Sequence, residues 1–209
     1  ELQDIKDSLG NLDDIIGDTF SDGIITEVER IRIEDSLIDL EKEKKDIKDR
    51  YTLIINDVGL TGGEEDALES AYTSFNTKYT QLVQFINDVI SDDKATESEK
   101  TKYQSKLRGY NETIPPLTVA FDNALKKIAE NKAKTLINET KSDIERDIQN
   151  VQQSVDGLEE TMLNSFRDGI IDETEYKAIK ESVHRLNTEK LDIDRNYEHL
   201  SVNIYIQSK

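Results

Sequence analysis

Apolar residues recur at alternating steps of three and four along almost the whole chain. In residues 1–20 these positions are Leu2, Ile5, Leu9, Leu12 and Ile16. The same spacing continues through 26–58, 64–91, 97–128 and 137–162. Heptad spacing places a narrow apolar stripe along one face of an α-helix. The pattern therefore predicts an all-α protein of long helices, each burying one face against a partner.

The segment Phe20–Glu29 recurs as Phe166–Glu175, an offset of 146 residues. The offset also aligns the stripe of 33–58 with that of 179–204, including a lysine at the same place in both. A long match at one offset indicates a tandem repeat. Because the second copy stops before the turn Thr61–Gly63 recurs, we expect the second unit to be incomplete.

Turn and cap residues divide the chain. Gly23 and Gly169 stand where a helix would end, and Thr61–Gly63 reads as a turn. Three helix starts carry a capping-box pattern: Thr26 with Glu29, Thr96 with Glu99, and Asp172 with Glu175.

These signals predict an elongated, spectrin-like three-helix bundle flanked by long coiled-coil helices. The expected parts are a coiled-coil helix over 1–21, the bundle over 22–130, a coiled-coil spacer helix over 131–165 and the start of a second unit over 166–209. The spacer has no sequence-local partner, so we expect it to pair with a parallel copy of itself.

Two features interrupt the stripe. Lys44 occupies an apolar position, and we expect its stem to lie along the stripe with the ammonium outside. Pro115–Pro116 falls inside the pattern without shifting its phase, which predicts a kinked helix rather than a loop. From 117 to 165 the pattern predicts one helix of about 70 Å, at 1.5 Å per residue.

Composition agrees with thin helical assemblies and excludes several function classes. The 209 residues are 35% hydrophobic and 34% charged, with nine Gly and two Pro. A net charge of −18 argues against nucleic acid and against an anionic membrane surface as partners. No signal peptide or apolar run long enough to span a membrane is visible. The absence of Cys excludes disulfides, thiolate metal sites and Cys nucleophiles.

Calcium is the best candidate ligand. Asp18, Asp22 and Glu29 fall at positions 1, 5 and 12 of an EF-hand loop, and Asn164, Asp168 and Glu175 do the same in the second copy. Phenylalanine (Phe20 and Phe166) stands at position 3, where an oxygen ligand is expected. Two interpretations remain: a weak calcium site, or a capped turn with the phenylalanine plugging the core beneath it.

No residue pattern identifies a reaction. His184 and His199 are the only histidines, fifteen residues apart on one predicted helix and without a nucleophile motif. We expect both at the surface or at the edge of the stripe, and we expect neither a catalytic residue nor a cofactor. The sequence thus favours a protein that is not an enzyme.

The turn Asp22–Glu29 followed by Leu40–Lys44, with its second copy at Asp168–Glu175, resembles a helical repeat of tail-tip and tail-fibre proteins from phages and prophages of Gram-positive bacteria. The resemblance covers about residues 8 to 206. It implies a helical stalk between a tail-docking end and a host-recognising or wall-degrading end, located in the virion tail.

The resulting hypothesis is a structural stalk that positions and oligomerises neighbouring domains. Its expected partners are parallel copies of itself, as a dimer or trimer, and other tail proteins. The alternative is a helical binding module of a bacterial surface or host-recognition protein. Exposed rings off the stripe would favour that alternative, and most rings here lie on the stripe.

Overall fold

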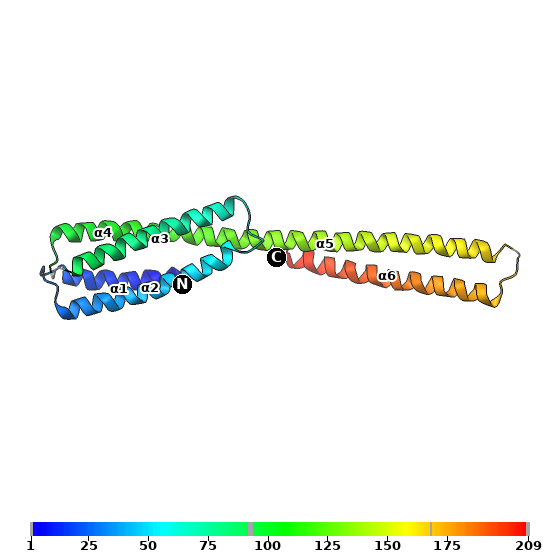
Figure 1. Ribbon diagram of the computed structural model, residues 1–209, viewed down its shortest axis with the longest axis horizontal. Helices are drawn as coiled ribbons and strands as arrows, with labels where there is room; N and C mark the ends of the chain where they lie inside the picture. The colour runs from blue at the N-terminus through cyan, green and yellow to red at the C-terminus, as the bar shows by residue number, and fades with distance from the viewer. Residues whose placement is uncertain (1, 92–93, 168, 208–209) are drawn as a thin grey trace. The chain divides into compact units, whose positions relative to one another are not determined.

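The computed structural model describes residues 2–91, 94–167 and 169–207, and this part of the chain is almost entirely helical (Figure 1). Its helices are α1 (Leu2–Thr19), α2 (Glu27–Ile55), α3 (Gly63–Ile90), α4 (Glu97–Asn111), α5 (Ile114–Ser165) and α6 (Glu173–Gln207). The described residues form no strand, apart from an isolated antiparallel bridge between Ile24 and Lys94. The all-α prediction is confirmed.

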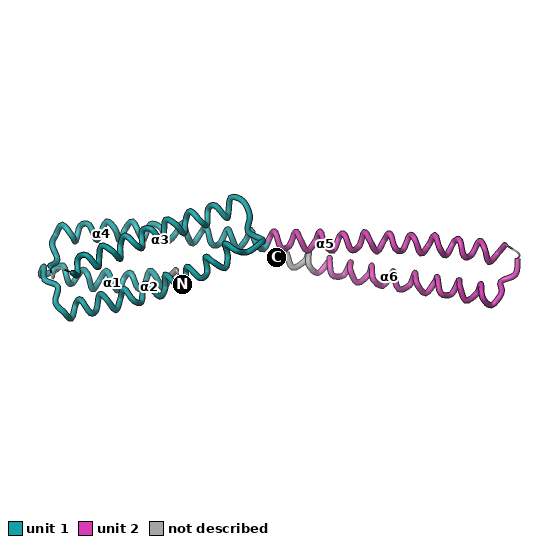
Figure 2. Tube along the Cα trace, in the orientation of Figure 1, with its two compact units in different colours: residues 1–129 teal, residues 130–209 magenta. Residues whose placement is uncertain are grey.

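The chain divides into two compact units, residues 1–129 and 130–209 (Figure 2). The division lies one residue from the predicted end of the bundle at 130. Helix α5 contributes its first part to the first unit and its remainder to the second.

In the first unit, α1 packs antiparallel to α2, α3 packs antiparallel to α4, and α2 lies beside α3 (Figure 1). The helices α2, α3 and the α4–α5 run make the predicted bundle, and α1 adds a fourth helix. The sequence predicted a separate coiled-coil helix over residues 1–21. That prediction was wrong, because this segment belongs to the first unit. The stripe of α1 is buried inside its own unit, at Ile5, Leu9, Leu12 and Ile16.

Two turns close one end of this unit and pair with each other. Gly23 adopts a positive φ of 77°, a conformation open to glycine and costly for other residues. Its carbonyl accepts a hydrogen bond from the Ala95 N–H (3.1 Å), beside the bridge between Ile24 and Lys94. The turn after α1 is thereby tied to the turn after α3.

The prolines do not lie inside an uninterrupted helix. Helix α4 ends at Asn111 and α5 begins at Ile114, so two turn residues separate them. Pro115 and Pro116 occupy the first turn of α5, where a missing N–H breaks no helical hydrogen bond. The prediction of one kinked helix was wrong at this point. The two-residue break places both prolines in the first turn of a new helix, where they disrupt no helical hydrogen bond.

The second unit is a hairpin of the remainder of α5 and the antiparallel α6 (Figure 2). The Ser154 hydroxyl donates to the Glu189 carboxylate (2.7 Å), and the Asn196 amide donates to Asp147 (2.6 Å). The helix over 131–165 therefore has a partner within its own chain, contrary to expectation. That partner is the repeat of α2.

Candidate functional site

Two of the three candidate calcium ligands in the first copy, Asp22 and Glu29, are engaged in holding the first turn. The Thr26 N–H and hydroxyl both donate to one Glu29 oxygen (2.9 and 2.6 Å), and the Glu29 N–H donates back to the Thr26 hydroxyl (3.3 Å). Asp22 accepts from the Ile24 N–H (3.0 Å), and Asp18 is exposed on α1. These contacts form the predicted capping box and an Asx turn.

The second turn is built in the same way. The Asp172 N–H donates to Glu175 (3.0 Å), and the Glu175 N–H donates to Asp172 (2.8 Å). Asn164 lies in the last turn of α5, and Asp168 lies outside the described residues. Within the described part of the chain, no three acidic or histidine side chains gather closely enough to hold a metal ion.

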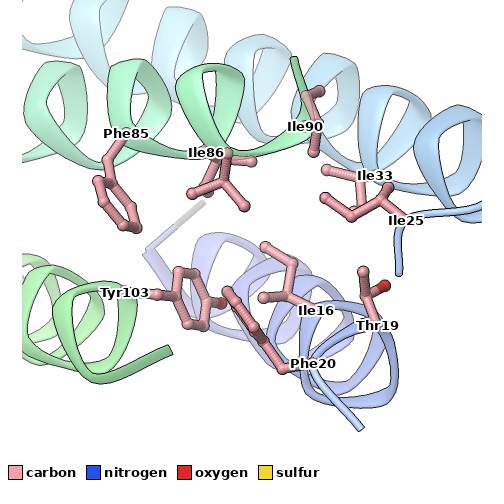
Figure 3. Close-up of a pocket in the computed structure, with 10 residues that line it drawn as sticks. Ile16, Thr19, Phe20, Ile25, Ile33, Phe85, Ile86, Ile90 and Tyr103 are labelled. Carbon is pink, nitrogen blue, oxygen red and sulfur yellow. The ribbon is translucent and has the colours of Figure 1, made fainter. Parts of the chain in front are cut away.

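An apolar pocket lies beneath the first turn (Figure 3). Ile16, Phe20 and Ile25 line it from α1 and the turn that follows, and Phe85 and Tyr103 line it from α3 and α4. Its volume of about 10 Å³ is barely that of one water, and an apolar site of this size stays dry. It is a small packing defect with no room for a ligand. Phe20 plugs this core as predicted, with its ring centroid 6.3 Å from that of Tyr103.

An open groove of about 520 Å³ runs between α1 and the α4–α5 junction. Asp13 lines it from α1, and Gln104, Arg108 and Glu112 line it from the other side. These are dispersed polar groups around Leu107 and Pro115, with no nucleophile and base among them. The histidines are elsewhere: His184 and His199 are both exposed on α6, which confirms their predicted surface position.

The buried side chains of the first unit that carry a polar group include Thr19, Thr113 and three tyrosines, and Lys44 is half-buried beside one of these rings. Burial, with nearby Glu41, raises the pKa of Tyr79 to about 12. Burial raises the pKa of Tyr103 and Tyr110 as well, and their hydroxyls lie deep in the bundle. The Lys44 ammonium stands 4.8 Å from the centroid of the Tyr79 ring, so it caps a ring while its stem follows the stripe.

A side-chain hydrogen bond that sequence reasoning missed occurs in both units. The Ser8 hydroxyl donates to Glu43 (2.5 Å), linking α1 to α2, and Ser154 donates to Glu189 in the same way. Ser154 and Glu189 follow Ser8 and Glu43 by 146 residues each. The signal was available, because a Ser and a Glu beside the stripe recur together at the repeat offset.

Comparison of the chain with protein-family models, with curated proteins and with solved structures finds no match. Within the described residues, no helix combines the length and the apolar character that crossing a membrane requires.

Helices α5 and α6 and the turn between them carry an exposed apolar surface. Its members all align with residues that are buried or ring-stacked in the first unit. We define the apolar face of the second unit as Val155, Met162, Phe166, Ile171, Val183 and Tyr197, each of which is exposed. Apolar side chains that are exposed here and covered in the equivalent unit are candidates for a site of association. The prediction that the phenylalanine plugs a core is wrong for Phe166.

Proposed function

We propose that this protein is a structural spacer, a tandem helical repeat that sets the separation and orientation of neighbouring domains. The observation that carries the proposal is the duplication of a complete local design. Ser8–Glu43 and Ser154–Glu189 are the same hydrogen bond, and the turns at Gly23 and Gly169 share a φ of 77°. Repeated units that contact only their neighbours are suited to mechanical roles.

The interior of the first unit supports this proposal. Its core is made of aliphatic side chains and rings, and its buried ionisable groups are tyrosines in their neutral form. The apolar pocket is too small for a substrate, and the polar groups of the open groove are dispersed. The burial in this unit stabilises a bundle, and none of it is arranged around a reacting atom.

The resemblance of the turn Asp22–Glu29 to a repeat of phage tail-tip and tail-fibre proteins supports a place in a phage tail. In that setting the expected partners are other tail proteins and, as predicted from the sequence, parallel copies of the chain. The parallel dimer or trimer stays a prediction. Sedimentation equilibrium of the full chain measures it directly, with a monomer at all concentrations as the contrary result.

A spacer must hold its ends at a fixed separation. Because the chain has no Cys, two spin labels can be attached at Asp122→Cys and Gln153→Cys, both exposed positions of α5 on either side of the division between units. Pulsed electron paramagnetic resonance is expected to give one narrow distance distribution. A broad distribution would contradict the spacer role, since a hinge at that place transmits no orientation.

A binding module is the second candidate, favoured by one observation. Tyr176 is exposed on α6 outside the repeated stripe, and Phe166 and Tyr197 are exposed as well. Exposed rings are the side chains on which sugar and peptide ligands stack. Binding to purified Gram-positive cell walls, weakened by Tyr176→Ala, is the result expected of such a module. A chain that stays in solution with these walls would remove this candidate.

A further inference from the structure

We infer that the apolar face of the second unit is a docking surface for a helical hairpin with the chemistry of α3–α4. The occupant is an antiparallel helix pair whose facing stripe carries tyrosine and phenylalanine rings and whose turn begins its second helix with a capping box. The first unit contains this arrangement within one chain. The inference depends on the internal repeat alone and holds whether or not the protein is a spacer.

The residues that meet α3–α4 in the first unit are retained in the second. In the first unit, seven side chains of α1, α2 and their turn line the apolar pocket with α3 and α4 or make a ring contact with α3 or α4: Ile16, Thr19, Phe20, Ile25, Ile33, Lys44 and Tyr51. Their equivalents at the offset of 146 are Met162, Ser165, Phe166, Ile171, Ile179, Lys190 and Tyr197. Five of these seven pairs are identical. In the second unit Ser165 is buried, Ile179 is half-buried, and the other five are exposed.

The surroundings of these side chains differ between the units. Tyr51 stacks on Tyr72 of α3 with ring centroids 3.9 Å apart, whereas the equivalent Tyr197 is exposed. Lys44 caps the Tyr79 ring, whereas the equivalent Lys190 is exposed and only approaches Asp194 (3.9 Å). Tyr197 and Lys190 are therefore placed to receive the kind of ring contact that their equivalents make with α3.

Ring chemistry decides between the possible occupants. The rings that contact these positions in the first unit come from α3 and α4, among them Tyr72, Tyr79 and Tyr103. A second copy of the α5–α6 hairpin would present this same face, in which Val155 and Val183 are aliphatic and the rings are Phe166 and Tyr197. The α3–α4 hairpin supplies the rings that these positions meet in the first unit, so a ring-bearing hairpin of that kind matches the face by the repeat, and a copy of α5–α6 does not.

The turn provides the register for docking. In the first unit, the Gly23 carbonyl accepts from Ala95 and the backbone of Ile24 bridges to Lys94. Gly169 holds the same φ of 77° as Gly23, and a Cβ placed on Gly169 would meet open space. The second turn is thus shaped for the same pairing with an incoming turn.

The test uses the full chain and a peptide of residues 61–113, which spans α3, its turn and α4. Met162 is the only methionine, so its isotope-labelled methyl group gives a single NMR signal from the face itself. Titration with the peptide is expected to shift this signal, because Tyr103 lies beside the equivalent Ile16. Phe166→Asp is expected to weaken binding by about tenfold or more, as the loss of an aromatic anchor does.

Leu163→Asp is the matched control. Leu163 is exposed next to Met162, and its equivalent, Gly17, is exposed in the first unit, outside the covered surface. Peptide binding is expected to be unchanged in this variant. Equal weakening by both substitutions would overturn the inference, because the peptide would then be responding to charge and not to the face.

A second variant, in which the α3–α4 hairpin is joined covalently to the end of α6, does not depend on whether the separate peptide folds. Residue 204 aligns with residue 58, so residues 59–113 are repeated after residue 204. The Met162 signal is expected to shift without added peptide and to return in the Phe166→Asp version. An unshifted signal in this chain overturns the inference. The inference is also overturned if the original chain sediments as a dimer and the Phe166→Asp variant sediments as a monomer, because a second copy would then occupy the face.

Discussion

The turn after α1 and the turn in the middle of the α5–α6 hairpin are built from the same residues and differ in what lies over them. Phe20 is 6% exposed and Phe166 is 54% exposed, while Ile25 and Ile171 are 3% and 43% exposed. Both turns carry a positive-φ glycine and a capping box. The local design of a helical hairpin is therefore independent of its burial. Burial requires a second hairpin, which the first unit has in α3–α4.

The two units therefore differ in what stabilises them: both have a hydrogen bond between paired helices, and the first also has a buried apolar core. Within each unit, one Ser–Glu hydrogen bond links the paired helices. Only the first unit adds a closed core, with Leu40, Ile47 and Leu68 fully buried. We expect the second unit to open more readily, since few buried apolar contacts mean low local stability.

The largest expected difference is between matched core leucines. Leu40 is fully buried and its equivalent Leu186 is half-buried. Leu40→Ala is expected to destabilise the first unit by about 2–5 kcal/mol, because it leaves a cavity. Leu186→Ala should cost the second unit less than half of that. Hydrogen exchange resolved by residue measures both, with Leu40→Met as a volume-conserving control. Equal losses would contradict the difference in burial.

Alkaline pH is expected to act on the first unit. Because burial raises the folded-state pKa of Tyr79 to about 12, its contribution is fully present below the unfolded value of about 10 and is lost as pH rises toward 12. The buried Tyr103 and Tyr110 act in the same direction. Unfolding followed by circular dichroism across this range should show the loss, and Tyr79→Phe should remove part of it. Stability of the first unit that is constant across this range would contradict the burial of these rings.

The Ser–Glu link is expected to contribute equally in both units. Ser8→Ala and Ser154→Ala should each cost about 1.5 kcal/mol, because each removes a donor to a carboxylate whose other oxygen is buried. A double-mutant cycle with Glu43→Gln or Glu189→Gln isolates the pair. A cost confined to Ser8 would show that the link depends on the cover of α3–α4.

The helix caps should give a smaller and equal effect. Thr26→Ala and Asp172→Ala each remove a capping side chain that accepts from the backbone three residues on, and about 1 kcal/mol is expected for either. Ser restores the cap at both places and is the control. The measurement is urea unfolding of each variant. A much larger loss at Thr26 would mean that its turn also organises the bridge to Lys94.

Calcium is expected to have no effect on either turn. The Glu29 oxygen that would ligate the ion already accepts two hydrogen bonds from Thr26. Melting temperatures with millimolar calcium and with a chelator should therefore agree. A rise with calcium that Asp18→Asn abolishes would restore the calcium interpretation, since Asp18 is exposed and takes no part in the capping box.

The sequence predicted which residues make up much of the apolar face of the second unit, but not whether another helix covers them. The offset of 146 aligned Phe166, Lys190 and Tyr197 with residues of the first unit. The heptad spacing then identified them as facing residues, because 3.6 residues per turn fixes which side chains share a helix face. The spacing does not state which helix is opposite. That is why the segment over 131–165 was expected to pair with a parallel copy, when α6 is its partner.

The sequence by itself determined the helices, the three capping boxes and the repeat, because these depend on residues within a turn or two of one another. The tertiary structure alone decided that α1 belongs to the first bundle, that two residues break the helix before Pro115, and that Phe20 is covered while Phe166 is exposed. These outcomes depend on contacts between segments far apart in the chain. A stripe of apolar residues must be buried, but the stripe alone does not determine which helix buries it.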